Sequence, residues 1–407
     1  MRNLSLICQV AQNSQGNWSK LIRKICIFTG SRADYGHLRW IMQEVQDDNQ
    51  LILHNLVSGA HLLSRLGETW REIDNDGFTI DTRVELDLEN NSNLGTAISV
   101  GHGISSFSKS LKKISPDMLV LLGDRYETFA VAVSGMLLQI PIAHIHGGET
   151  TEGVIDEAIR HSITKMAHIH FVAASEYRSR IMQLGEAPNR IYDYGAPGLD
   201  GLHRLRSVTK GELTSFLGIE LKNKIFLVTY HPSTLDSVAS EKNLVELLKT
   251  LNLYPKATII LTKANSDFGG DKINSYLEKF VKIDPKSRVL SNSLGLERYY
   301  SLMKLANVVI GNSSSGIIEA PVIGTPTVNI GTRQKGRARS PSIIDCPGSG
   351  HDIECAINTA LSLTFQKKAA RRISPYGRGD TSKKIVKTLK SISLNKILIK
   401  SFNNITF

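Results

Sequence analysis

The feature that most constrains the fold of this chain is the regular alternation of short apolar runs with amphipathic segments. The run Met118–Leu122 (MLVLL) contains no polar residue, and Lys24–Thr29 (KICIFT) is largely apolar. Continuous apolar strands separated by helices are typical of a parallel sheet that helices cover on both faces. We therefore expect an α/β fold.

The pattern occurs twice, with a pause at residues 201–222, which are polar and rich in Lys, Arg, Ser and Gly. In the first half we expect strands at Lys24–Thr29, Leu51–Val57, Met118–Leu122, Ile142–Ile145 and Ile169–Val172, and helices at about 37–47, 126–138, 155–166 and 176–184. In the second half we expect strands at Ile225–Thr229, Thr258–Leu261, Val308–Ile310 and Thr327–Ile330, and helices at about 242–251, 272–281, 297–305, 315–322 and 381–391.

These elements predict two Rossmann-like domains that face each other across a cleft. The expected organisation is an N-terminal extension (1–23), a first domain (24–204), a second domain (205–374), a helix that crosses back to the first domain (375–392) and a basic tail (393–407). In open α/β sheets, ligands bind beyond the carboxyl ends of the strands. Residues that directly follow strands are therefore the functional candidates.

The net charge of +11 is confined to the two ends of the 407-residue chain. Residues 1–23 hold three Lys or Arg and no acid, and residues 365–407 hold eleven against one acid, so the body is nearly neutral. We therefore expect solvated basic tails rather than a nucleic-acid partner. No apolar run is long enough to cross a bilayer, which predicts no membrane insertion. Four scattered cysteines fit a reducing compartment, and we expect a cytoplasmic protein.

Two loops of the first domain combine a glycine turn with charged residues. Gly30–Gly36 (GSRADYG) follows the first strand and offers an anion site, with Arg32 adding a charge and Asp34 as a helix cap. Asp124 and Arg125, in GDRYE, directly follow the most apolar strand. The alternative for both loops is an ordinary capped helix or a surface ion pair.

A third loop of the first domain reads HIHGGE. His144 and His146 lie two residues apart on a strand and are expected to share a face, which allows a metal site but does not establish one. The glycine pair at 147–148 is expected to let the backbone approach a ligand. Glu149 and Asp156 would add two acids to Asp124, enough for proton transfer. We expect no metal and no other cofactor.

The second domain carries features of a phosphate site. Gly311–Gly316 (GNSSSG) joins a strand to a helix, with Ser313 and Ser314 as donors and Glu319 one turn on as a ribose acceptor. The basic loop 331–339, with Arg333 among its four cations, suits a diphosphate. His231 and Asn265 follow neighbouring strands. The second domain would thus hold a nucleoside diphosphate, and the first would bring acids to the group it carries.

Taken in order, GSRADYG, GDRYE, HIHGGE with IDEAIRHSITK, GNSSSG and GTRQKGR resemble the hydrolysing UDP-N-acetylglucosamine 2-epimerases, in particular the bacterial branch of sialic and legionaminic acid synthesis. The resemblance covers about residues 24–390. It implies the glycosyltransferase-B architecture with UDP on the second domain. It also implies loss of UDP and of the carbon-2 proton to give a 2-acetamidoglucal, followed by addition of water and a proton on the opposite face.

The resemblance assigns roles position by position. The implied catalytic residues are Asp124, Glu149, Asp156 and His231; the UDP-binding ones are Arg32, Asn265, Ser313, Ser314, Glu319 and Arg333; the substrate-side ones are Asp34, His61, Arg125 and His146. Many members read HIEGGE, with a catalytic Glu where this chain has His146. Glu149, the remaining acid of the motif, is our choice for that role, with His146 as the alternative.

The favoured reaction is conversion of UDP-N-acetylglucosamine to N-acetylmannosamine and UDP. The alternatives are the same reaction on UDP-2,4-diacetamido-2,4,6-trideoxyglucose (UDP-diacetylbacillosamine), a non-hydrolysing epimerase, a glycosyltransferase on the same fold, and a non-catalytic UDP-binding module. The expected partners are the UDP-sugar substrate and, by family resemblance only, further copies of the chain in a homodimer or homotetramer.

Overall fold

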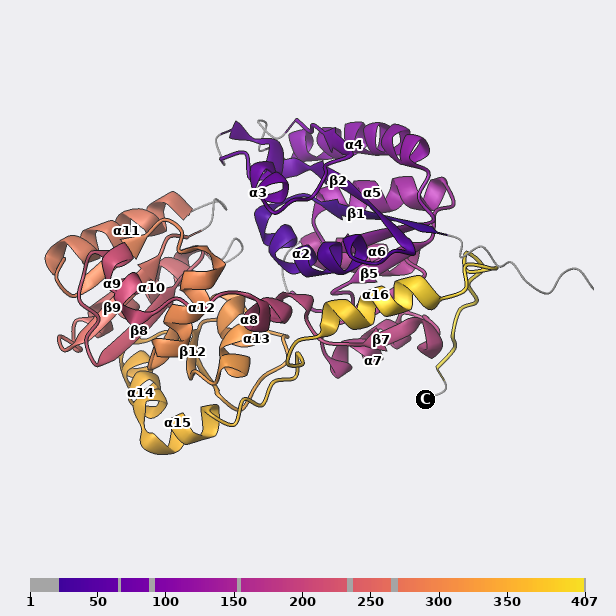
Figure 1. The fold of residues 1–407 in the computed structure, drawn as a ribbon. Helices are drawn as coiled ribbons and strands as arrows, with labels where there is room; N and C mark the ends of the chain where they lie inside the picture. Colours follow the sequence, from indigo (N-terminus) through magenta and orange to yellow (C-terminus); the bar gives the residue numbers. More distant parts are fainter. Residues whose placement is uncertain are drawn as a thin grey trace, which may run out of the picture.

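The computed structural model describes residues 22–64, 67–87, 92–151, 155–232, 237–264 and 270–405. The chain forms two parallel α/β domains, shown in purple and orange in Figure 1. This is the α/β architecture that the apolar runs predict. Among the described residues, no helix combines the length and apolarity that a membrane span requires.

The first domain contains a seven-stranded parallel sheet in the order β3-β2-β1-β4-β5-β6-β7. Its strands are β1 (Arg23–Thr29), β2 (Leu51–Ser58), β3 (Thr82–Val84), β4 (Met118–Leu122), β5 (Ile142–Ile145), β6 (Ile169–Val172) and β7 (Ile191–Asp193). Its helices are α2 (Arg32–Gln46), α3 (Trp70–Asn75), α4 (Asn93–Ile114), α5 (Tyr126–Leu137), α6 (Ile155–Met166) and α7 (Ser175–Gln183).

The second domain contains a six-stranded parallel sheet in the order β10-β9-β8-β11-β12-β13. Its strands are β8 (Lys224–Thr229), β9 (Ala257–Thr262), β10 (Arg288–Ser291), β11 (Val308–Gly311), β12 (Thr327–Ile330) and β13 (Ile343–Cys346). Helices α8 (Gly201–Arg204) and α9 (Lys210–Leu217) precede it; α10 (Ser237–Leu251), α11 (Gly270–Ile283), α12 (Gly295–Leu305), α13 (Ser314–Ile323), α14 (Gly350–Leu361) and α15 (Leu363–Ala369) cover it, and α16 (Thr381–Ser391) follows.

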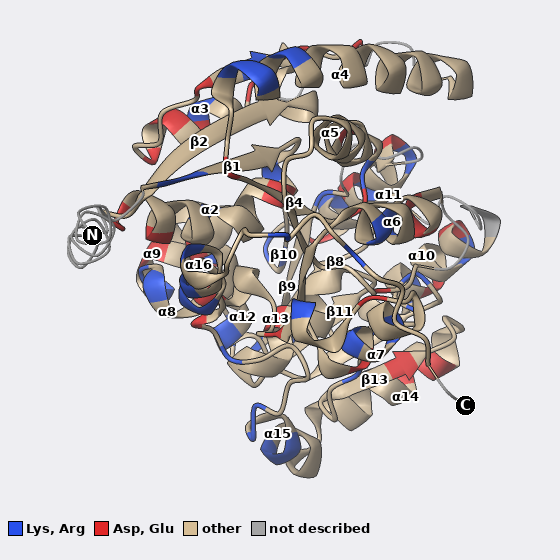
Figure 2. Cartoon of the chain, turned by 90° about the vertical axis from the view of Figure 1, so that its right-hand side faces the viewer, with Lys and Arg blue, Asp and Glu red and all other residues tan. Residues whose placement is uncertain are grey.

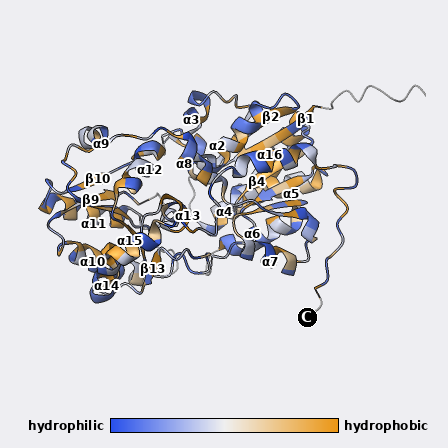
Figure 3. Ribbon diagram, turned by 60° about the horizontal axis from the view of Figure 1, so that its bottom comes forward, coloured by the Kyte–Doolittle hydropathy of each residue, from blue (hydrophilic) through white to orange (hydrophobic). Residues whose placement is uncertain are grey.

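The continuous apolar strands are explained by cores on both faces of each sheet. Along β1, Ile25 and Ile27 belong to the core beneath α2, whereas Cys26 and Phe28 belong to the core beneath α4 and α5. Successive side chains of a strand point to opposite faces, so a strand covered on both faces must be apolar at every position. In Figure 3 the strands are accordingly orange and the outer helix surfaces blue.

The last helix, α16, lies against the first domain although it follows the second, as Figure 1 shows in yellow. Ile385 and Leu389 are fully buried in the core beneath β1. The carboxylate of Asp200, 1% exposed, accepts hydrogen bonds from the first free amides of α16, Thr381 N at 3.0 Å and Ser382 N at 2.8 Å. These contacts tie the two domains together a second time.

Two expectations about the polar segments need correction. The pause at 201–222 contains α9, whose N-terminus has a capping box formed by Thr209 and Glu212 and whose Leu213 is fully buried. The C-terminal tail is not simply solvated. Lys400 lies in an ion pair with Glu186 at 2.8 Å, and Asn403 N donates to Gly185 O at 2.8 Å. Basic residues do gather on α15 and α16, drawn blue in Figure 2.

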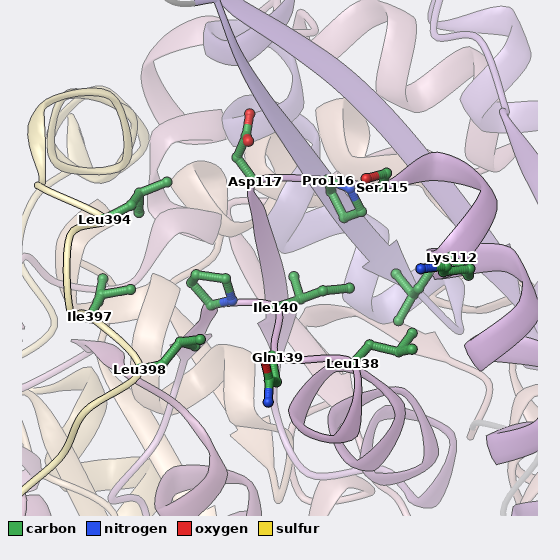
Figure 4. A pocket seen from close by; sticks show the side chains of 12 residues that line it. Lys112, Ser115, Pro116, Asp117, Leu138, Gln139, Ile140, Leu394, Ile397 and Leu398 are labelled. Atoms are coloured by element: carbon green, nitrogen blue, oxygen red, sulfur yellow. The ribbon is translucent and has the colours of Figure 1, made fainter.

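A cavity of about 380 Å³ lies at the amino ends of β4 and β5, opposite the carboxyl ends where ligands are expected. Pro116 and Pro141 precede the two strands, and Leu394, Ile397 and Leu398 of the C-terminal segment close the other side (Figure 4). It is separate from the candidate active site.

Candidate active site

A second cavity, of about 210 Å³, lies between the two domains. The first domain contributes residues that follow β1, β4 and β5, and the second contributes α13 and the loop after β12. The lining residues are Ala33, Asp34, His37, Leu122, Gly123, Asp124, Arg125, His146, Glu149, Arg160, Ser314, Ile318 and Arg337. The position matches the cleft that the sequence predicts, and it combines three carboxylates, three guanidinium groups and two imidazoles.

Asp124 is held in the cavity by a buried arginine. Arg160, on α6 and only 2% exposed, donates from Nε to the Asp124 carboxylate at 2.8 Å and from a terminal nitrogen to the same oxygen. Its other terminal nitrogen donates to Glu149 O at 2.7 Å and Glu157 at 2.6 Å. One guanidinium therefore fixes both acidic loops. The sequence analysis did not assign Arg160 a role, because nothing in the sequence pairs it with Asp124.

Asp156 lies near Asp124 but does not line the cavity. Burial, and then the charge of Asp124, raise the pKa of the Asp156 carboxyl. Two carboxyls in one site disfavour simultaneous ionisation, so Asp156 is suited to hold a proton. Of the three acids that the sequence groups together, Asp124 and Glu149 line the cavity, and Asp156 lies close enough to Asp124 to be affected by its charge.

Asp34 and Arg125 also line the cavity. Burial raises the pKa of Asp34 to about 6, although Arg125 opposes the shift. Asp34 is not the helix cap that we expected: Ser31 Oγ accepts from Asp34 N at 3.3 Å, and the Asp34 carboxylate accepts from Gly30 N at 3.3 Å. Because α2 begins at Arg32, Ser31 occupies the N-cap and Asp34 lies in the first turn, where its carboxyl lines the cavity.

Glu149 contacts His146 of its own domain and Arg337 of the second domain. It is 4% exposed, and its Oε1 lies 2.5 Å from His146 Nδ1 while its Oε2 lies 3.5 Å from a nitrogen of Arg337. Burial raises the pKa of Glu149, but His146 and Arg337 outweigh it and lower the value to about 2. Glu149 is therefore a carboxylate at neutral pH.

The two histidines of HIHGGE do not share a face, contrary to expectation. His144 lies within β5 and is fully buried, with its Nε2 2.8 Å from Gly123 O. Burial lowers the pKa of His144 to about 3. His146 comes after the strand and has a φ of +64°, which turns its side chain toward the cavity region. The strand has its predicted bounds, Ile142–Ile145, so His146 lies one residue beyond it and the alternation of faces does not extend to His146. Among the described residues, no group of three or more His, Cys, Asp or Glu side chains is arranged to hold a metal ion.

The glycine pair serves internal packing rather than ligand approach, which corrects our expectation. A Cβ on Gly147 would lie 3.0 Å from His144 Nδ1, and one on Gly148 would lie 2.5 Å from Tyr177 O. Gly148 also has a φ of +76°, in the region that favours glycine. Both glycines are therefore needed to close the loop against α7 and β5.

In the second domain, the loop after β11 forms the predicted turn. Ser313 is the N-cap of α13 and accepts from Ser315 N at 3.4 Å, while Ser314 reaches the cavity. The side chain of Asn312 accepts a hydrogen bond from His231 N at 2.7 Å and donates one to His231 O at 2.8 Å. These two bonds place the loop that carries His231 beside the N-terminus of α13. Asn265 lies outside the described residues.

Glu319 is buried one turn into α13. Burial raises its pKa to about 7, and its Oε2 is buried with no hydrogen-bonding partner among the described residues. A buried polar atom without a partner is uncommon and is compatible with a ligand donor. The predicted ribose acceptor is therefore in a suitable environment.

The basic loop after β12 does not present all its cations to a diphosphate. Arg333 donates to Asn312 O at 3.2 Å, Arg337 lines the cavity, and Arg339 pairs with Asp345 at 3.0 Å. Ala338 N of this loop donates a hydrogen bond to the phenol oxygen of Tyr177, in the first domain, at 3.0 Å. The loop therefore forms hydrogen bonds with both domains. Sequence reasoning did not single out Arg337, because its partner lies in the other domain.

Two further predicted residues, His61 and Arg32, do not line the cavity. His61 is fully buried, with Nε2 2.9 Å from Thr29 Oγ1 and Nδ1 2.8 Å from Thr69 Oγ1. Both ring nitrogens are used internally, so the structure does not place His61 on the substrate side. Arg32 pairs with Glu72 at 3.0 Å at the cleft edge and reaches Ser293 of the second domain at 3.4 Å. A further residue that the sequence analysis missed, His37 on α2, lines the cavity.

The two parallel sheets and the cavity between them define a two-domain α/β protein with charged residues gathered at an interdomain site. The profile of the UDP-N-acetylglucosamine 2-epimerase family matches residues 43–390, and the chain belongs to this family. The chain is 39% identical over 381 residues to the GDP/UDP-N,N'-diacetylbacillosamine 2-epimerase (hydrolyzing) of Campylobacter jejuni, covering 93% of this chain and 98% of that protein.

Two further comparisons agree with this assignment. The UDP-N,N'-diacetylbacillosamine 2-epimerase (hydrolyzing) of Legionella pneumophila is 34% identical over 386 residues, covering 94% of this chain and all of that protein. The crystal structure of UDP-GlcNAc 2-epimerase from Neisseria meningitidis bound to UDP-GlcNAc superimposes with a TM-score of 0.77 at 19% identity, covering 90% of this chain and 99% of that one. The predicted two-domain architecture is confirmed.

Proposed function

We propose that this chain is a hydrolysing 2-epimerase whose preferred substrate is a UDP-linked N,N'-diacetylbacillosamine. The observation that carries the choice is the near full-length similarity to two proteins named for that substrate, at 39% and 34% identity. Our sequence analysis favoured UDP-N-acetylglucosamine, which the family description supports only at the level of the whole family. The product would serve legionaminic acid synthesis.

The second domain supplies the nucleotide site in this proposal. The amides at the N-terminus of α13 and the hydroxyls of Ser313 and Ser314 receive the diphosphate, since a helix N-terminus favours anions. Glu319 accepts from the ribose hydroxyls. Arg333 and His231 each form a hydrogen bond with Asn312 and therefore flank the turn between β11 and α13. The sugar then extends into the cavity between the domains.

The first domain supplies the proton-transfer groups. A base removes the proton at sugar carbon 2 while the bond from carbon 1 to UDP breaks, and a 2-acetamidoglucal forms. Water then adds at carbon 1, and carbon 2 receives a proton on the opposite face. Asp34 and Asp156 have raised pKa values and are suited to hold a proton. Arg125 and Arg160 balance the negative charge that remains on the other acids.

The experiment is a substrate comparison with purified protein in D₂O. UDP-N,N'-diacetylbacillosamine, its GDP analogue and UDP-N-acetylglucosamine are each incubated separately, and NMR follows the free sugar, the nucleotide and deuterium at carbon 2. We expect stoichiometric nucleotide release, a manno-configured sugar deuterated at carbon 2, and a kcat/KM at least tenfold higher for the diacetamido sugar, about 1.4 kcal/mol. A preference for UDP-N-acetylglucosamine would restore our first choice of substrate.

The same experiment separates the other reaction classes. An intact UDP-sugar epimer without nucleotide release would identify a non-hydrolysing epimerase. Nucleotide release that requires an added acceptor would identify a glycosyltransferase. Binding of UDP without any turnover would identify a binding module.

A further inference from the structure

His146 has a backbone conformation that few side chains adopt. Its φ is +64°, in the left-handed region, and its N–H donates to Phe171 O at 3.1 Å, which holds the residue at the end of β5. A non-glycine residue in this region costs of the order of 1 kcal/mol, and such residues cluster at active sites. Gly147, which follows, has no room for a side chain. The strained turn therefore fixes where the imidazole lies.

The carboxylate of Glu149 fixes the orientation of the ring. Oε1 of Glu149 lies 2.5 Å from Nδ1 of His146, and the two side chains are 6% and 12% exposed. Because Glu149 is ionised at neutral pH, Nδ1 carries the proton of this hydrogen bond. The lone pair is then on Nε2, which is buried and has no hydrogen-bonding partner among the described residues. His146 lines the interdomain cavity, so Nε2 is the ring nitrogen left for a ligand.

We propose that Nε2 of His146 is the base that takes the proton from carbon 2 of the sugar, and that Glu149 is a positioning residue that holds the imidazole. The inference rests on the proposed function. The resemblance assigns one catalytic role to either Glu149 or His146, and this proposal divides it: His146 takes the proton and Glu149 positions the ring. It differs from our sequence choice, in which Glu149 itself transfers the proton.

The step balances without any further reactant. The C2–H bond breaks and the proton goes to Nε2. The electron pair of that bond forms the double bond between carbon 1 and carbon 2, and the bond between carbon 1 and the UDP oxygen breaks with its pair leaving on UDP. The imidazolium that results lies beside the Glu149 carboxylate, which stabilises the new charge. The proton that returns on the opposite face comes from another group, for which Asp34 is suited.

Glu149 is poorly suited to transfer the proton itself. One of its oxygens is 2.5 Å from His146 and the other is 3.5 Å from Arg337. These partners hold its pKa at about 2, so it is a weak base and is not protonated near neutrality. The same two contacts make it an effective anchor.

The charged and titratable groups around the imidazole come from five elements, including β5 with His144, whose pKa is lowered to about 3, chiefly by burial. Glu149 is on the same loop, His37 on α2 has its ring centroid 5.5 Å away, and Arg337 belongs to the loop after β12. Arg160 on α6 donates to the carbonyl of Glu149. Burial, and then His146, lower the pKa of His37 to about 3, so His37 is neutral and does not compete for the proton.

The test compares His146→Gln and Glu149→Gln with the matched pair His54→Gln and Asp81→Asn. His54 Nδ1 lies 2.7 Å from Asp81 Oδ1 outside the cavity, so this pair has the same chemistry without the site. For each full-length variant, kcat and KM, the UDP dissociation constant, Tm and deuterium exchange at carbon 2 are measured from pH 5 to 9.

We expect His146→Gln to lower kcat by about 10²- to 10⁴-fold, as for loss of a general base, with UDP affinity within about threefold of wild type. Glu149→Gln should lower kcat by about tenfold or more and move the acidic limb of the kcat/KM profile to lower pH, because the imidazolium loses its counter-charge. The His54 and Asp81 variants should match wild type in kcat and in the pH profile.

Several results would overturn the inference. Near-normal kcat and exchange in His146→Gln would do so while leaving the proposed function intact. An unshifted acidic limb in Glu149→Gln would assign Glu149 a structural role only, and this measurement decides the matter if His146→Gln does not fold. Wild-type protein that turns over none of the nucleotide sugars would instead refute the proposed function.

Discussion

Arg337 of the second domain reaches Glu149 of the first domain at 3.5 Å, and Glu149 in turn contacts His146 at 2.5 Å. The loop that carries Arg337 also accepts a hydrogen bond from Thr150 through Gly336 O at 2.9 Å. The position of the basic loop is therefore linked directly to the acidic loop of the other domain. These interdomain contacts therefore also hold Glu149, the proposed anchor of His146, in place.

Arg337→Ala should remove this link. Glu149 would stay buried with one ion-pair partner fewer, and leaving a buried polar group without a partner costs about 1–3 kcal/mol. We expect kcat/KM to fall about 10- to 100-fold, with a smaller change in UDP affinity, because Arg337 contacts the acidic loop. Steady-state kinetics and titration calorimetry measure the two quantities.

Lys335→Ala is the control for that variant. Lys335 is an exposed cation on the same loop and does not line the cavity. Its loss should leave kcat/KM within about twofold, since surface substitutions away from a site have small effects. Equal losses in both variants would show that the loop tolerates no substitution and that the contact with Glu149 has no special importance.

Asp124→Asn should reduce kcat by about 10²- to 10⁴-fold with little change in UDP binding. The amide keeps the size of the side chain but loses the charge that pairs with Arg160. Asp117→Asn, near the amino end of the same strand and outside the cleft, is the matched control. Turnover of Asp124→Asn close to that of wild type would show that Asp124 has no part in the chemistry.

The strands could be predicted because their signal is local. Ile142–Ile145 and Ile169–Val172 have the predicted bounds, since helices cover both faces and every position is buried. The edge strands β3 and β7 have three residues each and give no periodic signal. The long helix α4 was missed because glycines and serines fill it, including Gly103 and Ser99 on its buried face.

The location of the site was predictable, but its pairings were not. Asp124, Asp34 and Ser314 follow strands and meet at one cavity, as the carboxyl-end rule predicts. The contacts of Arg160 with Asp124 and of Arg337 with Glu149 join residues from different elements, and no spacing in the sequence specifies them. The orientation of His146 depends on a positive φ that the strand pattern concealed.

Glu319 should make stability depend on pH in an identifiable way. Its pKa rises from 4.5 unfolded to about 7 folded, because of burial. Between these values the folded state binds more protons than the unfolded state, so the free energy of unfolding falls as pH rises from about 4.5 to 7. Glu319→Gln has no carboxyl to ionise in the buried site. Its stability relative to wild type should therefore rise across that pH window, by at most roughly 3 kcal/mol.

Urea unfolding of wild type and Glu319→Gln between pH 4.5 and 8 measures this difference. Glu176→Gln, at an exposed position on α7, is the control and should show no growing advantage. A difference that stays constant with pH would mean that folding does not raise the pKa of Glu319.

The C-terminal segment should stabilise the first domain through Lys400. The Nζ of Lys400 donates to Ala167 O at 2.6 Å and pairs with Glu186, which is 1% exposed and also contacts Lys165 and His170. Lys400→Ala leaves this buried carboxylate with fewer partners, so we expect a loss of about 1–3 kcal/mol and a lower Tm. This contribution of Lys400 to stability should depend on pH. Burial alone would raise the pKa of Glu186, but His170, Lys165 and Lys400 lower it to about 2.

The stabilisation by the ionised Glu186 is therefore present above about pH 4.5 and disappears as pH falls toward 2. Lys384→Ala, exposed on α16, should leave Tm unchanged, and an equal Tm for both variants would show that the segment adds no stability.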